Sequence, residues 1–330
     1  MKTDIELILE KTKSLHNQLQ NKTILLTGSN GFLGTYFSLV LQHLNCKVIL
    51  LDNLLVPNKK NHNNLPNNFT FIQHDITKSF ETKEKIDCII NCAGIASPYW
   101  YARFPLETLK LGVSGLENML QLSVEHKARL LFFSSSEIYA TPNENNIPTK
   151  ETYIGQVPTL TERSSYDISK LMGETLCYIF NTKYNADAVI CRPFNFYGAL
   201  MSNNDNRVLP AFRERIKEGL PLMINSGGSQ TRSFCHIIDA IDGCFRILVN
   251  GRKNEAYNIG NTATEVSMVE LTKSMERVLS KKLDVVLNNM PDVYKTEPLR
   301  RNPDITKAQT ELGFEPVIGL EEGLARFFNV

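Results

Sequence analysis

Short apolar runs alternate with stretches of helical periodicity from residue 23 to about residue 195. The apolar runs have the length of strands and cover residues 23–27, 47–51, 69–72, 86–91, 129–134 and 187–192. The helical stretches include residues 32–44, 105–126 and 166–184. Repeated alternation of this kind predicts an α/β fold, a Rossmann-type doubly wound parallel sheet with helices on both faces.

A glycine-rich turn joins the first apolar run to the first helical stretch. Gly28, Gly31 and Gly34 lie in this turn. In a strand–turn–helix unit, such glycines permit the tight turn, the approach of the backbone to phosphates, and close packing of helix on strand. The second apolar run ends in Asp52, where a carboxylate accepts hydrogen bonds from ribose hydroxyls and repels a 2′-phosphate. These residues predict a dinucleotide site that binds NAD in preference to NADP.

The regularity of the pattern falls after residue 195, which predicts a second unit. We expect an NAD-binding Rossmann domain over residues 21–195 and a smaller α/β domain, mainly for substrate, over residues 196–330. Within the latter, residues 232–260 are expected to return in part to the Rossmann sheet. Residues 4–20 have the pattern of a short amphipathic helix that packs on the body or on a neighbouring subunit, and we therefore set residues 1–20 apart.

Composition excludes several classes of protein. The 330 residues include 36 Lys and Arg and 35 Asp and Glu, without a basic block, which argues against nucleic acid or an anionic membrane as partner. The 7 cysteines form no Cys-x-x-Cys pair and are expected to be reduced, as in a cytoplasmic protein. No cluster has metal-ligand spacing, and no run approaches a membrane span or a signal peptide.

Tyr166 and Lys170 lie four residues apart at the beginning of a predicted helix, so they share one helix face. Ser135 lies upstream, at the end of a predicted strand. A lysine ammonium beside a phenol stabilises the phenolate and lowers the pKa of the tyrosine toward neutrality. Such a tyrosine can take the proton of a sugar alcohol while hydride leaves for a nicotinamide, with Ser135 bonded to the same oxygen. The pattern predicts alcohol oxidation as the first chemical step.

Segments from residue 22 almost to the end of the chain resemble the extended short-chain dehydrogenase/reductases that act on nucleotide sugars. The segments are 28–34, 52–53, 74–76, 134–139, 166–170 and 192–198. Within that family the chain is most similar to the UDP-glucuronate decarboxylase (UDP-xylose synthase) group. This closer resemblance depends on segments 96–98, 105–110, 151–157, 163–167, 206–208, 228–234 and 301–305.

The resemblance implies roles for individual residues. It implies Tyr166, Lys170 and Ser135 as catalytic groups, with Glu137 and Arg301 at the sugar carbon that loses CO₂. Substrate contacts are implied for Lys110 and Asn118 at the sugar and its carboxylate, and for Asn195, Arg207 and Arg232 at the UDP. Cofactor contacts are implied for Gly28, Asn30, Gly31, Phe32, Leu33, Gly34, Asp52, Asn53, Asp75, Ile76, Ala93, Lys170 and Pro193.

The implied reaction is NAD-dependent decarboxylation of a UDP-uronic acid, of the UDP-glucuronate to UDP-xylose type, through a transient 4-keto intermediate. Sugar 4,6-dehydratases are similar to this group but have Asp-Glu where this chain has Ser136-Glu137, and serine protonates a leaving hydroxide poorly. A β-keto acid loses CO₂ into its ketone, after which Glu137 is expected to deliver a proton to the ring. The resemblance also implies a homodimer in which helices 105–126 and 166–184 pair with their copies.

Two other functions stay open at this point. One keeps the hydride chemistry but makes the protein a nucleotide-sugar 4-epimerase or another sugar oxidoreductase, for example for surface polysaccharide precursors. The other is a non-catalytic dinucleotide sensor or scaffold. Ser135, Tyr166 and Lys170 argue against the sensor, since binding alone does not need them.

Overall fold

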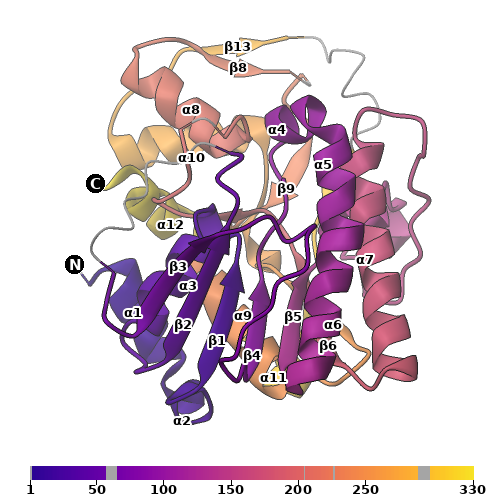
Figure 1. Cartoon of the computed structure of the whole chain (residues 1–330). Coiled ribbons are helices and arrows are strands. Elements are labelled where there is room, and N and C mark those ends of the chain that lie inside the picture. The colour runs from indigo at the N-terminus through magenta and orange to yellow at the C-terminus, as the bar shows by residue number, and fades with distance from the viewer. Residues whose placement is uncertain (1, 57–64, 204, 226, 289–297) are drawn as a thin grey trace.

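Seven parallel strands form the central sheet of the protein (Figure 1). The computed structural model describes residues 2–56, 65–203, 205–225, 227–288 and 298–330. The strand order is β11-β6-β5-β4-β1-β2-β3, which confirms the predicted doubly wound fold. The strands are β1 (Thr23–Thr27), β2 (Lys47–Asp52), β3 (Phe69–Gln73), β4 (Cys88–Asn91), β5 (Arg129–Phe133), β6 (Asp187–Pro193) and β11 (Ala256–Ile259).

Helices cover both faces of this sheet, as its apolar strands require. In β1, Ile24 and Leu26 belong to one buried core and Leu25 to the other, because successive side chains point to opposite faces. The first core includes helices α3 (Phe32–Leu41), α9 (Ile237–Asn250) and α11 (Thr306–Leu312). The second includes α6 (Leu116–His126) and α7 (Ser164–Lys183), beside α5 (Pro105–Lys110).

The helix expected over residues 105–126 is interrupted. A π-helical turn at Leu111–Gly115 separates α5 from α6. The turn lies close against α7, since a Cβ on Gly112 would lie 2.5 Å from the Cβ of Ser169. The apolar residues keep their helical spacing through this turn. The sequence pattern therefore does not show that the π-helical turn contains one more residue than an α-helical turn.

A smaller unit with its own core covers one end of the sheet (Figure 1). It contains α8 (Val208–Lys217), β8 (Leu222–Ile224), β9 (Thr231–Ser233), β12 (Glu265–Ser267), α10 (Met268–Leu279), β13 (Val285–Leu287), β14 (Arg300–Arg301) and α12 (Leu320–Phe328). Strand β9 pairs with both β12 and β14, which sets Arg232 directly beside Arg301. Between these elements, β10 (Cys235–His236) pairs with β7 (Phe196–Tyr197), and the chain then adds α9 and β11 to the central sheet.

The N-terminal segment contains shorter helices than the sequence pattern predicts. It contains α1 (Asp4–Lys11), a 3₁₀ turn and α2 (His16–Leu19) instead of one helix. Ile8 is fully buried, and Lys11 Nζ donates to Asp239 Oδ1 of α9 at 2.7 Å. From α12, Arg326 Nη1 donates to the Lys2 carbonyl at 3.0 Å. The segment thus packs on the body of its own chain and connects both halves of it.

Among the described residues, no helix combines the length and the apolar character needed to cross a membrane.

Candidate active site

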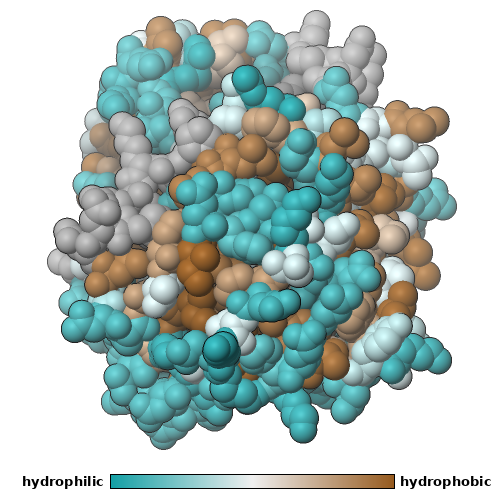
Figure 2. Space-filling model, viewed as in Figure 1, coloured by the Kyte–Doolittle hydropathy of each residue, from teal (hydrophilic) through white to brown (hydrophobic). Residues whose placement is uncertain are grey.

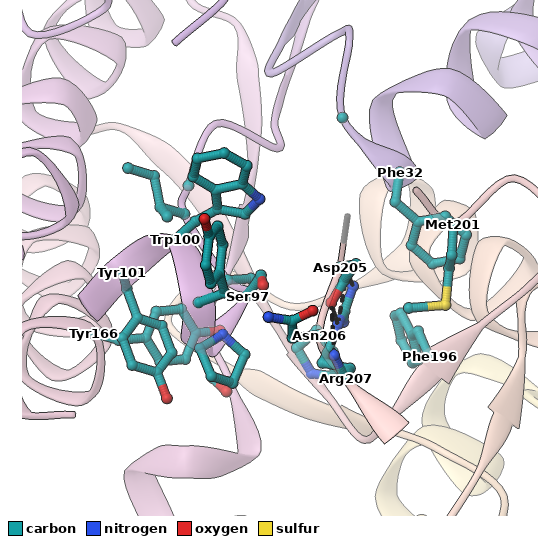
Figure 3. A pocket seen from close by; sticks show the side chains of 18 of the residues that line it. Phe32, Ser97, Trp100, Tyr101, Tyr166, Phe196, Met201, Asp205, Asn206 and Arg207 are labelled. Atoms are coloured by element: carbon teal, nitrogen blue, oxygen red, sulfur yellow. Dashed lines mark hydrogen bonds and ion pairs between the residues drawn. The ribbon is translucent and has the colours of Figure 1, made fainter. Parts of the chain in front are cut away.

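A cavity of about 1050 Å³ lies at the carboxyl ends of the central strands (Figure 3). This is where ligands bind in open parallel sheets, and the volume is at the upper end of the range typical of ligand pockets. The cavity brings together most of the residues that the sequence singled out. Those that line it are Gly28, Asn30, Gly31, Phe32, Leu33, Gly34, Asp52, Asn53, Ile76, Ala93, Ser135, Glu137, Tyr166, Lys170, Pro193, Asn195, Arg207, Arg232 and Arg301.

The glycine turn after β1 forms a cradle that side chains would fill. Gly28 has a φ of +62°, and a Cβ there would lie 2.7 Å from the backbone nitrogen of Ala93. A Cβ on Gly34 would lie 2.2 Å from the Gly28 carbonyl oxygen. The Asp52 carboxylate accepts hydrogen bonds from the backbone N–H groups of Asn30 (2.9 Å) and Leu54 (2.8 Å). Bare backbone for a pyrophosphate and a fixed carboxylate for a ribose fit NAD.

Tyr166 lies in the first turns of α7, with its side chain directed into the cavity (Figure 3). Lys170 Nζ is 5.5 Å from the centre of its ring and donates to the Phe133 carbonyl at 2.8 Å. Burial raises the pKa of Tyr166 to about 12, and the Ser135 hydroxyl offsets only part of this effect. Burial also lowers the pKa of Lys170 to about 8. The pKa of the tyrosine in the ligand-free protein is therefore not near neutrality as expected, because desolvation dominates.

An aromatic helix lies against Tyr166. Tyr101, on α4 (Pro98–Arg103), stacks on the Tyr166 ring with centroids 5.4 Å apart and planes inclined by 14°. Trp100, the single tryptophan of the chain, lines the same wall of the cavity (Figure 3). Neither residue was expected at the site, although three successive aromatic residues at 99–101 were a signal in the sequence.

Glu137 is held by two arginines. Its carboxylate accepts from Arg301 Nη1, which comes from β14, and from Arg163 Nη2, at the N-cap of α7. Burial raises the pKa of Glu137, but Arg301 and Arg163, with Arg232 contributing less, outweigh it and hold the pKa at about 2. Sequence reasoning did not name Arg163 as a site residue. Its position one helical turn before Tyr166 was the available signal.

The cavity also carries basic and amide side chains, among them Arg207 and Asn206 (Figure 3). Arg207 Nε donates to Asp205 Oδ2 at 2.9 Å, and Asn195 Nδ2 donates to the Ser233 carbonyl at 2.8 Å. Arg232 Nη1 donates to the Thr231 carbonyl at 2.8 Å. These contacts hold the side chains in place and leave a polar surface suited to the phosphates and base of a nucleotide.

Three residues that the sequence assigned to ligands do not line the cavity. Lys110 is exposed on α5. Asn118 Nδ2 donates to the Ile76 carbonyl at 2.8 Å, and Asp75 Oδ1 accepts from the backbone N–H of Thr77 at 3.0 Å. The contact from Asn118 thus supports Ile76, which does line the cavity.

Within the part of the chain that the structure describes, no group of three or more His, Cys, Asp or Glu side chains could hold a metal ion.

Comparisons with known proteins identify the family of this fold. The chain belongs to the NAD dependent epimerase/dehydratase family, whose sequence model matches residues 24–260. More specifically, it is similar to UDP-glucuronic acid decarboxylases. UDP-glucuronic acid decarboxylase 5 of Arabidopsis thaliana is 35% identical over 308 residues, which cover 92% of this chain and 87% of that protein. UDP-glucuronic acid decarboxylase 1 of Danio rerio is 34% identical over 93% of this chain and 72% of that protein.

Solved structures of two nucleotide-sugar epimerases have this fold. The UDP-glucose 4-epimerase of Thermotoga maritima, with UDP-glucose, superposes with a TM-score of 0.82 at 25% identity, covering 93% of this chain and 97% of that one. The UDP-glucuronic acid 4-epimerase of Bacillus cereus, in complex with UDP-glucuronic acid and NAD, gives a TM-score of 0.79 at 23% identity, covering 93% and 98%.

Proposed function

We propose that the protein decarboxylates a UDP-uronic acid, of the UDP-glucuronate to UDP-xylose type, with bound NAD and through a transient 4-keto sugar. The observation that carries the proposal is the burial and incomplete hydrogen bonding of Arg301. Its side chain is 6% exposed, it lines the cavity, and its Nε has no hydrogen-bond partner among the described residues. A buried guanidinium N–H without a partner is costly, and a substrate carboxylate oxygen would satisfy it.

The charge around Glu137 supports a carboxylate substrate. Three arginines, Arg163, Arg232 and Arg301, act on this one carboxylate, and Asp167 lies 3.8 Å from Arg163, so the charges of these five side chains sum to +1. A uronic acid brings a further anion that balances this charge, whereas a neutral hexose does not. The match to UDP-glucuronic acid decarboxylases at 34–35% identity supports the same substrate class.

The residues of the cofactor half have defined tasks in this proposal. The turn at Gly28–Gly34 would hold the pyrophosphate of NAD and Asp52 the adenine ribose, and the bound dinucleotide supplies the hydride acceptor. Tyr166 takes the proton of the sugar 4-hydroxyl, and Ser135 bonds to the same oxygen. Lys170 favours the phenolate while it is protonated, which holds below its pKa of about 8.

Carbon dioxide then leaves from the 4-keto uronic acid. The electrons of the breaking carbon–carbon bond flow into the 4-ketone, which becomes an enolate that Tyr166 stabilises by hydrogen bonding. A proton is then added at the carbon that lost CO₂, and return of the hydride to the sugar 4-carbon would give the pentose in a reaction without net oxidation or reduction. With its pKa held at about 2, Glu137 is a carboxylate in the ligand-free protein. Delivery of this proton by Glu137 requires that the substrate carboxylate, a like charge beside it, first raises that pKa.

Incubation of the purified protein with UDP-glucuronate and NAD tests the proposal. We expect CO₂ and a UDP-pentose, identified by mass spectrometry, and neither product from UDP-glucose. A UDP-hexuronic acid isomer without CO₂ would instead support the 4-epimerase, and no reaction of any nucleotide sugar would support a sensor. Emission of Trp100 at the cavity wall gives an independent measure of ligand binding.

We further propose that the protein is a cytoplasmic homodimer that pairs through α5 and α7. Leu106 on α5 is 64% exposed and Tyr178 on α7 is 61% exposed, with Met172 and Ile179 also exposed on α7. Figure 2 shows hydrophobic side chains on the right of the view, where Figure 1 places these helices. An exposed apolar face on two packed helices suits self-pairing about a two-fold axis. The seven free cysteines suit a reducing compartment.

A further inference from the structure

We propose that Arg163 is a positioning residue of the active site, which holds the Glu137 carboxylate on Arg301 and fixes this pair relative to Tyr166. The inference depends on the proposed function only for the identity of the substrate. It concerns a residue that neither the glycine motif nor the Tyr166–Lys170 pattern includes.

The geometry connects three separate parts of the chain. Arg163 precedes Ser164, the first residue of α7, so it is joined by one helical turn to Tyr166. Its Nη2 donates to one oxygen of Glu137, and Arg301 Nη1 donates to the other. Glu137 follows β5, and its backbone N–H donates to Ser135 Oγ at 3.2 Å. One carboxylate therefore links the helix of Tyr166, the loop of Ser135 and strand β14.

Arg163 lies in a largely buried position from which it can hold Glu137 in place. Its side chain is 13% exposed, and that of Glu137 is 19% exposed. Within α7, Arg163 Nε also lies 3.8 Å from Asp167 Oδ2, one turn further along. A planar guanidinium that bonds to one carboxylate and lies beside a second has little freedom, so it restricts the direction in which Glu137 points.

The charged and titratable groups that face Glu137 come from β14, α7 and β9. Arg301 of β14 and Arg163 of α7 bond to it directly, and Arg232 of β9 acts from a greater distance. Tyr166 of α7 faces it as a titratable group. If Arg163 is removed, Glu137 keeps Arg301 but loses one of its two bonded cations. Loss of an adjacent opposite charge typically raises the pKa of a carboxyl by about one to three units.

A double-mutant cycle tests whether Arg163 acts through Glu137. The variants are Arg163→Met, Glu137→Gln and the two combined, and CO₂ release is followed in single turnovers. We expect Arg163→Met to slow the reaction at least about tenfold in the wild-type background but less than about twofold in Glu137→Gln. Arg163→Lys, which keeps the charge, should restore part of the rate. Equal slowing in both backgrounds would show that Arg163 does not work through Glu137.

Titration of the Glu137 carboxyl gives a second result that does not depend on the substrate. In ligand-free protein labelled with ¹³C-glutamate, the Glu137 signal is identified by its loss in Glu137→Gln. We expect Arg163→Met to raise this pKa by about one to three units. An unchanged pKa would overturn the inference. Because this measurement needs no turnover, it decides the role of Arg163 even if the wild type releases no CO₂ and the proposed function fails.

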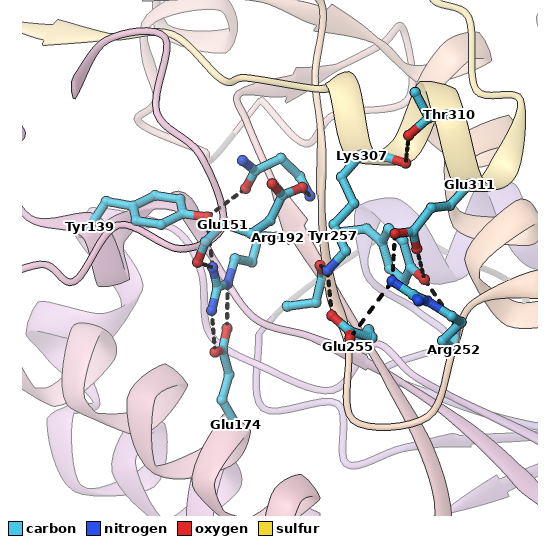
Figure 4. Close-up of polar contacts among 12 residues, drawn as sticks. Tyr139, Glu151, Glu174, Arg192, Arg252, Glu255, Tyr257, Lys307, Thr310 and Glu311 are labelled. Atoms are coloured by element: carbon cyan, nitrogen blue, oxygen red, sulfur yellow. Dashed lines mark hydrogen bonds and ion pairs between the residues drawn. The ribbon is translucent and has the colours of Figure 1, made fainter. Parts of the chain in front are cut away.

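Arg192 provides a matched control (Figure 4). It pairs with Glu174 of the same helix α7 at 2.7 Å, and the two side chains are 11% and 16% exposed. Unlike Arg163, it does not line the cavity. Arg192→Met should lower the thermal unfolding midpoint and leave the Glu137 pKa unchanged. If Arg192→Met shifts that pKa as much as Arg163→Met, the effect is a general loss of structure and the inference fails.

Discussion

Removal of Arg301 should separate decarboxylation from nucleotide binding. The guanidinium bonds to Glu137 through Nη1, and its buried Nε has no hydrogen-bond partner among the described residues. The change Arg301→Ala removes the contact that we assign to the substrate carboxylate and to the charge that develops as CO₂ leaves. Arg207, which is paired with Asp205 elsewhere in the cavity, stays in place to bind UDP.

The burial of Arg301 sets the size of the effect. The residue is 5% exposed, so solvent screens its charge only weakly. Loss of one preorganised donor in a closed site costs about 2–4 kcal/mol of transition-state stabilisation. At about 1.4 kcal/mol for each factor of ten, CO₂ release should slow about 30- to 1,000-fold. Arg301→Lys should lie between this variant and the wild type, because it keeps the charge without the planar fork.

The assay combines single-turnover CO₂ release with calorimetric titration of UDP for each variant. The neighbouring Arg300 is the control, since it pairs with Glu265 at 2.6 Å, is 37% exposed and does not line the cavity. Arg300→Ala should leave CO₂ release within about twofold of the wild type, because Arg300 lies outside the cavity and cannot contact the substrate carboxylate. Unchanged CO₂ release in Arg301→Ala would remove this residue from the reaction. Loss of UDP affinity in the same variant would show that its effect is not specific to the carboxylate.

Three further predictions concern the base, the cofactor and the assembly. Tyr166→Phe should lower oxidation of the sugar by about 10²–10⁴-fold while NAD still binds by calorimetry, and normal turnover would exclude the phenol as the base. Asp52→Ala should reduce the preference for NAD over NADP, measured by titrating both, because the carboxylate that repels a 2′-phosphate is gone. Tight NADP binding to the wild type would contradict this assignment. A double change of Leu106 and Tyr178 to Asp should convert a dimer to a monomer by light scattering, and a wild-type monomer would refute the dimer.

The local patterns of the sequence were sufficient for the fold and for most of the residues that line the cavity beside the glycine turn. The alternation of apolar runs with helical stretches predicts the sheet. The glycine turn at Gly28–Gly34 and the carboxylate of Asp52 can be recognised because each directly follows a predicted strand. The π-helical turn at Leu111–Gly115 was not predicted, because the apolar period passes through it unchanged. The raised pKa of Tyr166 was missed for a related reason, since the sequence shows its neighbour Lys170 but not its burial.

The arrangement of Glu137, Arg163 and Arg301 depends on contacts between segments that are far apart in the sequence. Arg301 reaches Glu137 across 164 residues of chain, and only resemblance to known enzymes suggested their connection. Arg163 had a helical spacing to Tyr166 that was visible, but its bond to Glu137 was not. Lys110 was expected at the substrate and is exposed on α5 instead, because a residue type at a matched position does not fix the direction of its side chain.

The docking of α1 has a consequence for the order of folding. Lys11 of α1 and Asp239 of α9 are separated by 228 residues, so their contact closes a long loop. Contacts of such large sequence separation form slowly, and we expect docking of α1 on α9 late in folding. The contact of α1 with α3, where the Tyr36 hydroxyl donates to Asp4 at 3.3 Å, spans few residues and can form early. Helix α1 is therefore expected to gain its two neighbours at different stages of folding.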